Sequence, residues 1–124
     1  MSTRPDKKNI LVVNDKRLMR EILADMLKDM GYNVVMAEDG YKAIEKVKEV
    51  SFAIIFLDMR MPGINGVETL KEIKKINPET RVVMMTAYVG KNLEKEALKH
   101  GADTVIYKPF DMKEVMAIVE KLDG

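Results

Sequence analysis

The chain has 124 residues, of which 47% are hydrophobic and 33% are charged, with 21 Lys and Arg against 20 Asp and Glu. This length suits a single globular domain, and no apolar run reaches the roughly 20 residues that a membrane-spanning helix requires. The net charge of +1 gives no electrostatic basis for direct binding to nucleic acid or to a membrane, and the absence of Cys excludes disulfides and thiolate chemistry.

Short apolar runs alternate with segments of helical periodicity along the chain. Residues 1–8 form a polar tail without the apolar core of a signal peptide, so we expect a cytoplasmic location. Five runs rich in β-branched residues predict strands: Ile10–Val13, Val34–Ala37, Ala53–Leu57, Val82–Met85 and Thr104–Tyr107. Apolar residues at helical spacing predict five amphipathic helices, around 18–30, 43–47, 67–73, 93–98 and 115–122. This alternation predicts an α/β fold with a parallel sheet covered on both faces.

Two residue types invite a functional interpretation that the pattern does not favour. Most of the 11 Met residues fall on the apolar helix and strand positions, where filling the core explains them better than metal binding does. His100, the single imidazole, stands at the C-terminal turn of a predicted helix, and we expect it to be solvated and without a catalytic role.

Polar side chains follow four of the five predicted strands. Asn14 and Asp15 come after the first strand, Asp58 after the third, Thr86 after the fourth and Lys108 after the fifth. In an open parallel sheet, ligands bind outside the carboxyl ends of the strands, near the point where strand order reverses. We therefore expect these side chains to meet in one crevice.

The residue types in this crevice indicate a phosphoryl and metal chemistry. Carboxylate and amide oxygens suit Mg²⁺, which takes one or two carboxylates and keeps several waters. Lys108 offers a charge and Thr86 a hydroxyl to phosphoryl oxygens, while Asp58 can act as a carboxylate nucleophile. Taken singly, the Asp residues could be helix N-caps, Thr86 could end a strand and Lys108 could be a solvated cation. Their recurrence at successive strand ends favours the functional interpretation.

The residues around these positions predict the shape of the crevice. Pro62-Gly63 bends the chain away from the end of the third strand, and Ala87 is small enough to let a phosphoryl group approach. Pro109 holds Lys108 in an extended conformation. The Lys108–Pro109 bond is also a candidate for cis geometry, because Pro lowers the cost of the cis form.

On these residues the sequence resembles the response-regulator receiver domains of two-component signalling. The resemblance covers residues 9–122 and rests on ILVVND, FLDMRMPGINGVETL, VVMMTAY and GADTVIYKPFD, in this order and at matching spacing. It implies a flavodoxin-like (βα)5 fold, a doubly wound parallel five-stranded sheet with strand order 2-1-3-4-5. It also implies that a histidine kinase or histidine phosphotransfer protein supplies a phosphoryl group to Asp58, with Mg²⁺ or Mn²⁺ as the cofactor.

The same resemblance implies a role for each residue of the crevice. It makes Asp58 the phosphoacceptor and the receiver a signalling protein rather than an enzyme, one that assists its own phosphorylation and dephosphorylation. Asp15, Asp58 and the backbone carbonyl of Arg60 would ligate the metal, Asn14 would lie in its outer shell, Thr86 would move toward the phosphoryl group, and Lys108 would pair with it.

MTAY and KPFDMKEV look most like single-domain phosphorelay proteins of the sporulation type, and also like receivers that precede ATP-dependent transcription activators. The sequence ends at Asp123-Gly124 with no output domain, so we expect a free-standing phosphoryl shuttle with a downstream phosphorelay or output partner. An excised receiver would have the same sequence.

Two positions depart from the family pattern. Asn14 replaces the first of two acids, and Val105 occupies the commonly aromatic position three before Lys108. Tyr107 is close in sequence, but we expect it to face the other side of the strand.

The alternative function is a pseudo-receiver, an unphosphorylated interaction module in which Asn14 has weakened the metal site. A flavodoxin-like cofactor binder is disfavoured, because residues 14–17 form no hydroxyl- or Gly-rich phosphate loop.

The sequence also predicts the character of two surfaces. Lys16, Arg17, Leu18 and Arg20 form a mixed basic and apolar surface where partner specificity should lie. Arg60 and Tyr88 are expected at the rim of the crevice, where bulky side chains would exclude water and slow hydrolysis of the acyl phosphate.

Overall fold

The computed structural model describes residues 8–61, 63–87 and 91–123. Within these ranges, strands and helices alternate in the predicted order. The strands are β1 (Asn9–Val13), β2 (Asn33–Ala37), β3 (Ile54–Asp58), β4 (Arg81–Thr86) and β5 (Thr104–Tyr107). The helices are α1 (Arg17–Asp29), α2 (Gly40–Glu49), α3 (Gly66–Ile76), α4 (Lys91–Lys99) and α5 (Met112–Asp123). None of these described helices is both long and apolar enough to cross a bilayer.

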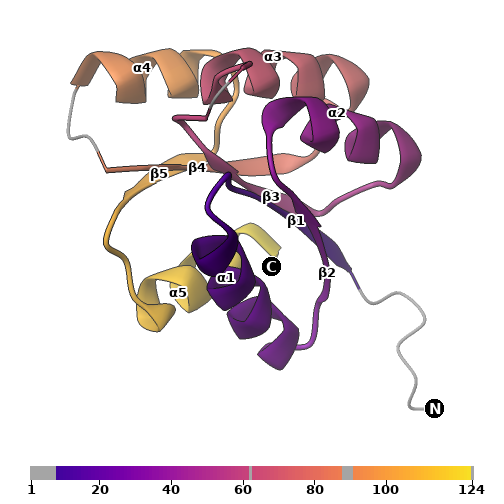
Figure 1. Ribbon diagram of the computed structural model, residues 1–124. Coiled ribbons are helices and arrows are strands. Elements are labelled where there is room, and N and C mark those ends of the chain that lie inside the picture. Colours follow the sequence, from indigo (N-terminus) through magenta and orange to yellow (C-terminus); the bar gives the residue numbers. More distant parts are fainter. Residues whose placement is uncertain (1–7, 62, 88–90, 124) are drawn as a thin grey trace.

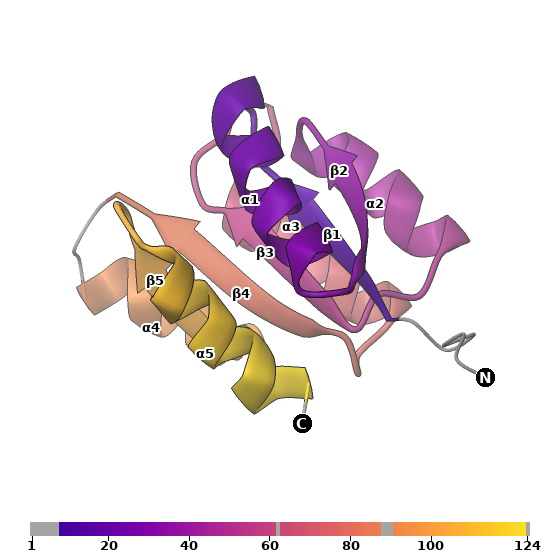
Figure 2. The same ribbon diagram turned by 90° about the horizontal axis from the view of Figure 1, so that it is seen from below.

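The strands form one parallel sheet in the order β2-β1-β3-β4-β5, which confirms the predicted fold class and strand order. Helices α2, α3 and α4 cover one face of the sheet, and α1 and α5 cover the other (Figure 1). Seen from the side of α1 and α5, the strands run diagonally behind these two helices (Figure 2). The chain moves from β1 to the edge strand β2 and returns to β3 on the other side, so the switch point lies between β1 and β3.

Side chains of alternating strand residues divide between two hydrophobic cores, as the two-residue period of a strand requires. Leu11 and Leu57 belong to the core under α2, α3 and α4, whereas Val12 and Phe56 belong to the core under α1 and α5. The central strands β1 and β3 are buried on both faces, which explains their continuous apolar runs.

The Met residues serve the core only in part. Met59, Met84 and Met85 are buried, as core filling predicts, but Met36, Met112 and Met116 rank among the exposed hydrophobic residues.

The connection between β3 and α3 is packed tightly against the end of β3. The Asn65 side chain caps α3 by accepting a hydrogen bond from the Glu68 N–H at 2.9 Å. The next residue, Gly66, donates its N–H to the Met59 carbonyl at 3.0 Å. A Cβ atom at Gly66 would lie 2.6 Å from the Asp58 carbonyl oxygen, so only glycine lets α3 start this close to the strand.

Glycines also follow the C-terminal ends of two helices. Gly31 after α1 and Gly101 after α4 have positive φ angles of 99° and 106°, the left-handed conformation typical of a residue following a helix.

Candidate functional site

A pocket of about 430 Å³ lies at the carboxyl edge of the sheet, close to the switch point. It brings together residues at the ends of β1, β3, β4 and β5. Of the five side chains predicted to meet in one crevice, Asp15, Asp58 and Lys108 line this pocket, whereas Asn14 and Thr86 do not. Its lining consists of Asp15, Lys16, Met19, Asp58, Arg60, Ala87 and Lys108.

Asp58 is the last residue of β3, and its side chain is only 5% exposed. One carboxylate oxygen, Oδ2, lies 3.2 Å from the Lys108 Nζ. The other, Oδ1, accepts a long hydrogen bond of 3.4 Å from the Arg60 N–H. A buried carboxylate requires such partners, because an unpaired charge in this position would be strongly unfavourable.

Asp15 follows β1 and differs from Asp58 in its surroundings. It is exposed, and no other described residue forms a hydrogen bond or an ion pair with its carboxylate. The two acids therefore lie in the same pocket, one held by Lys108 and the other open to solvent or to a ligand.

Asn14 is almost fully buried, at 2% exposure, and it does not line the pocket. Its Oδ1 accepts a hydrogen bond of 2.9 Å from the Lys16 N–H, which closes a short turn between β1 and α1. The same amide oxygen can accept a second hydrogen bond, as a role in the outer shell of a metal would require. That role of Asn14 stays a prediction.

Thr86 and Lys108 lie at neighbouring strand ends. Thr86 pairs with Tyr107 in the register of β4 and β5, and the Thr86 carbonyl accepts a hydrogen bond of 2.7 Å from the Lys108 N–H. Thr86 is 2% exposed, and its neighbour Ala87 lines the pocket instead. The Lys108–Pro109 peptide bond is cis, as its sequence allowed.

Neither acid is used as a helix cap. Lys16 occupies the N-cap position of α1 without a side-chain hydrogen bond, and Asn65 caps α3. The purely structural explanation of Asp15 and Asp58 as N-caps is therefore wrong, which strengthens the interpretation that they serve a ligand.

The oxygen donors at the pocket suit Mg²⁺. Two carboxylates, those of Asp15 and Asp58, face the pocket. In the described part of the chain, no group of three or more acidic, His or Cys side chains could hold a metal. A site with two carboxylates fits Mg²⁺, which takes few protein ligands and keeps water, better than it fits Zn²⁺.

One expectation about β5 is wrong. Tyr107 faces the same side of the sheet as Val105, because residues two apart in a strand share a face. Val105 packs against the core under α2, α3 and α4, and the Tyr107 hydroxyl donates a hydrogen bond of 2.5 Å to Glu94 of α4. An aromatic ring therefore does reach α4 from β5, although from a different position than in the family pattern.

Sequence reasoning missed part of the pocket wall. It assigned Lys16 to a docking surface and gave Met19 no role, yet both line the pocket. Met19 comes four residues after Asp15, and this spacing at the start of a helix was the available signal. Arg60 lines the pocket as expected, whereas Tyr88 lies outside the described residues.

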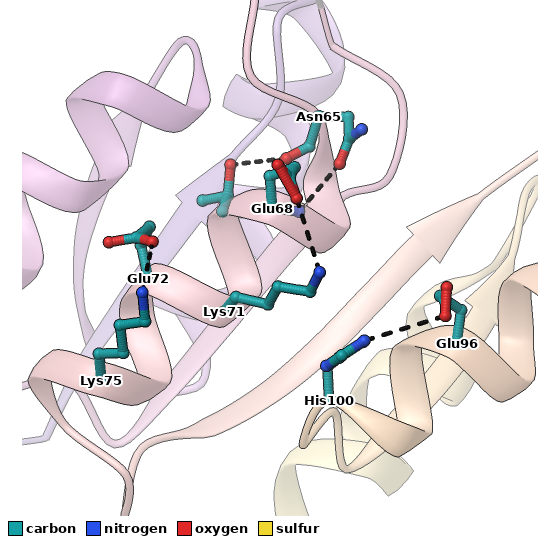
Figure 3. Close-up of polar contacts among 8 residues, drawn as sticks. Asn65, Glu68, Lys71, Glu72, Lys75, Glu96 and His100 are labelled. Atoms are coloured by element: carbon teal, nitrogen blue, oxygen red, sulfur yellow. Dashed lines mark hydrogen bonds and ion pairs between the residues drawn. The ribbon is translucent and has the colours of Figure 1, made fainter.

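A second and larger cleft, of about 510 Å³, lies between α3 and α4 and shares only Arg60 with the pocket. Glu68 lies 3.6 Å from Lys71 within α3, and Glu96 of α4 lies 3.9 Å from the imidazole of His100, the residue after that helix (Figure 3). The strand-end acids do not line this cleft, so we place the chemistry in the smaller pocket. His100 lies beside Glu96, outside the pocket.

Comparisons with known proteins agree with this geometry. The profile of the family described as "Response regulator receiver domain" matches residues 10–120. The chain is 36% identical to the chemotaxis protein CheY of Thermotoga maritima over 93% of the chain and 97% of that protein. It is also 36% identical to sporulation initiation phosphotransferase F of Bacillus subtilis, over 90% of both proteins.

Longer relatives and solved structures give the same result. The chain is 42% identical to transcriptional regulatory protein ZraR of Escherichia coli over 94% of the chain, but it spans only 26% of that relative's length. The crystal structure of a CheY-like receiver domain protein from Methanospirillum hungatei superposes with a TM-score of 0.90, at 28% identity and 95% coverage of both chains. The pocket, the fold and these matches together show that the chain belongs to the response-regulator receiver domain family of two-component signalling.

Proposed function

We propose that this receiver accepts a phosphoryl group on Asp58 from a phosphohistidine of a histidine kinase or a histidine phosphotransfer protein. The observation that carries the proposal is the position of Asp58, buried at the end of β3 with Lys108 Nζ 3.2 Å from its carboxylate, in a pocket shared with Asp15. A buried acid with one cationic partner and an open approach from the pocket suits nucleophilic attack on phosphorus.

The transfer balances without a further reactant. An Asp58 carboxylate oxygen forms a bond to phosphorus as the bond from phosphorus to the imidazole nitrogen breaks, and the electron pair leaves with the imidazole. The product is an acyl phosphate on Asp58. Lys108 is placed to pair with a phosphoryl oxygen, and Thr86, at the end of the adjacent strand, would supply a hydroxyl to a second one.

Asp15, Asp58 and the backbone carbonyl of Arg60 would hold Mg²⁺ or Mn²⁺, with Asn14 in the outer shell. Bound metal would neutralise negative charge that the transfer spreads over the phosphoryl oxygens. The exposed carboxylate of Asp15, which has no hydrogen-bond or ion-pair partner among the described residues, supports this assignment, because none of their interactions would have to break for it to bind a cation.

The partner would dock beside the pocket, on the first turns of α1. Leu18 is 69% exposed and Ile22 44% exposed on this helix, and Met19 between them lines the pocket. Arg20 is only partly exposed and its guanidinium donates a hydrogen bond to the Asn14 carbonyl, so it would contribute less to this docking surface than the exposed Lys16, Arg17 and Leu18. A helical partner that presents its phosphohistidine beside an apolar patch fits this arrangement.

A relay or output partner downstream, in the cytoplasm and without direct contact to nucleic acid, completes the proposal. The similarity to sporulation initiation phosphotransferase F supports a free-standing relay protein, and the similarity to one part of ZraR supports a receiver joined to an output region.

The alternative is a pseudo-receiver that presents its surface to a partner without phosphorylation. The neutral Asn14 favours it, since only two carboxylates remain at the pocket. The intact contact between Asp58 and Lys108 favours the phosphoacceptor.

Intact-mass spectrometry after incubation with phosphoramidate and Mg²⁺ separates the two functions. The phosphoacceptor predicts one phosphoryl adduct that is lost in hydroxylamine, and Asp58→Ala should abolish it. Asp25→Ala, which removes an exposed acid of α1, is the matched control and should still be labelled. Labelling of Asp58→Ala to a similar extent would make the assignment wrong, and an unlabelled parent would favour the pseudo-receiver.

A further inference from the structure

The connection between β1 and α1 carries Asn14 and Asp15, and it lacks the usual helix cap. Lys16 at the N-cap position makes no side-chain capping bond, and the first turn of α1 contains no acid. Helix N-termini are normally stabilised by a capping side-chain oxygen and by negative charge in the first turn, and α1 has neither. Something else must hold this connection in place.

Three hydrogen bonds converge on Asn14 instead. Its N–H donates to the Ala37 carbonyl at 3.2 Å, and its Oδ1 accepts from the Lys16 N–H at 2.9 Å. Its backbone carbonyl accepts a hydrogen bond of 2.8 Å from the guanidinium of Arg20, in a partly buried position. The last is the only one of the three with a charged donor, and such bonds are roughly twice as strong as neutral ones.

The Arg20 contact acts on the peptide unit that leads into Asp15. The carbonyl of Asn14 and the N–H of Asp15 belong to the same rigid plane, so fixing the oxygen fixes the direction in which Asp15 leaves the strand. The Asp15 carboxylate has no side-chain partner among the described residues, and its backbone must therefore orient it.

The position of Arg20 also argues for a specific role. Positive charge near a helix N-terminus is unfavourable, and Arg20 lies in the first turns of α1, close to Lys16 and Arg17. Arg17, by contrast, is 81% exposed and pairs with Glu21 along the helix surface. Only the guanidinium of Arg20 turns back to the connection that carries Asp15.

We infer that Arg20 is a positioning residue for Asp15, holding the proposed metal ligand in place through the Asn14 carbonyl. The inference rests on the proposed function, because it concerns the metal site on which that function depends. Arg20 itself would contact neither the metal nor the phosphoryl group.

The sign of a mutational effect distinguishes positioning from simple electrostatics. Removal of a positive charge near a cation site should by itself tighten Mg²⁺, because like charges repel. Loss of positioning should weaken Mg²⁺, and residues that orient metal ligands typically contribute about 10–100-fold to affinity. We expect Mg²⁺ binding by Arg20→Ala to be weaker by about 10-fold or more.

The experiment is a Mg²⁺ titration, by calorimetry, of the parent, Arg20→Ala, Arg20→Lys and the control Arg17→Ala, well below their melting temperatures. Arg20→Lys keeps a charged donor on a shorter side chain, and its affinity should fall between the parent and Arg20→Ala. Arg17→Ala removes the same charge without touching Asn14, and its affinity should not fall. Equal or tighter binding by Arg20→Ala, or binding by Arg20→Lys no tighter than by Arg20→Ala, overturns the inference.

A metal-free measurement keeps this test separate from the proposed function. Amide hydrogen exchange of the Lys16 N–H, which is bonded to Asn14 Oδ1, should be faster in Arg20→Ala than in the parent or in Arg17→Ala when chelator is present. Unchanged exchange overturns the positioning role even if no protein binds Mg²⁺. If the parent protein does not bind Mg²⁺ but the Lys16 N–H still exchanges faster in Arg20→Ala, the result contradicts the proposed function and leaves the positioning role of Arg20 standing.

Discussion

The Nζ atom of Lys108 lies 3.2 Å from Oδ2 of Asp58, although the two residues are 50 positions apart in the chain. The parallel order of β3, β4 and β5 brings them together, because every one of these strands ends at the same edge of the sheet. Asp58 is the more buried partner, with 5% of its side chain exposed against 20% for Lys108. The contact therefore stabilises a buried carboxylate before any phosphoryl group is present.

Lys108→Ala should destabilise the protein, because it leaves the Asp58 carboxylate buried without its cation. The loss should be about 1–3 kcal/mol at neutral pH. Urea unfolding of Lys108→Ala, Asp58→Asn and the double variant forms a double-mutant cycle, and the double variant should recover part of the loss. Additive effects of the two changes would mean that the contact contributes nothing to stability.

Asn14→Asp should strengthen the metal site, because a third carboxylate raises the negative charge beside Asp15 and Asp58. We expect about tenfold tighter Mg²⁺, or about 1.4 kcal/mol, from a change in the outer shell. The melting temperature in chelator should fall, since residue 14 is 2% exposed and the new charge would be buried. Titration calorimetry and thermal melts test both effects; equal Mg²⁺ affinity would place Asn14 outside the influence of the metal.

Arg60→Asn should shorten the lifetime of the acyl phosphate by several fold. Arg60 lines the pocket and is exposed at its rim, so its long side chain can keep water from the phosphorylated Asp58. The decay of the adduct after removal of the phosphodonor measures this, with Lys71→Ala, in the neighbouring cleft, as the control. A decay no faster than that of the parent would remove shielding by Arg60 as the explanation.

Tyr107 should make stability depend on pH only in the alkaline range. The hydrogen bond to Glu94 raises the pKa of Tyr107 above its ordinary value, with smaller contributions from desolvation and from the charge of Glu94. A pKa that is higher in the folded state means that the stabilisation is complete below the unfolded pKa, about 10, and is lost as the pH rises through the folded value.

Urea unfolding at pH 8 and above pH 10 tests this, with Tyr107→Phe and, as the control, Tyr41→Phe, since Tyr41 is 60% exposed. The parent should be more stable than Tyr107→Phe at pH 8, and the difference should shrink at the higher pH. Tyr41→Phe should show no such change. A difference between the parent and Tyr107→Phe that stays constant across this range would contradict the contribution of the hydroxyl.

Local sequence patterns were sufficient to predict the alternation of strands and helices and the position of Asp58 at a strand end. Both follow from local patterns, since a short β-branched run cannot form a helix and residue 58 must follow Leu57 wherever that strand lies. Because ligands bind outside the carboxyl ends of parallel strands, Asp15, Asp58 and Lys108 were expected at one edge of the sheet, and all three line the pocket.

The partner that each polar side chain contacts could not be predicted from these patterns and is seen in the folded chain. Tyr107 reaches Glu94, Asn14 turns its amide oxygen to Lys16, and Arg20 turns back to the Asn14 carbonyl. Such contacts depend on rotamers and on packing between elements distant in sequence, which periodicity does not encode. The sequence therefore determined where the chemistry collects, and the packing of helices on the sheet decided how each group is held there.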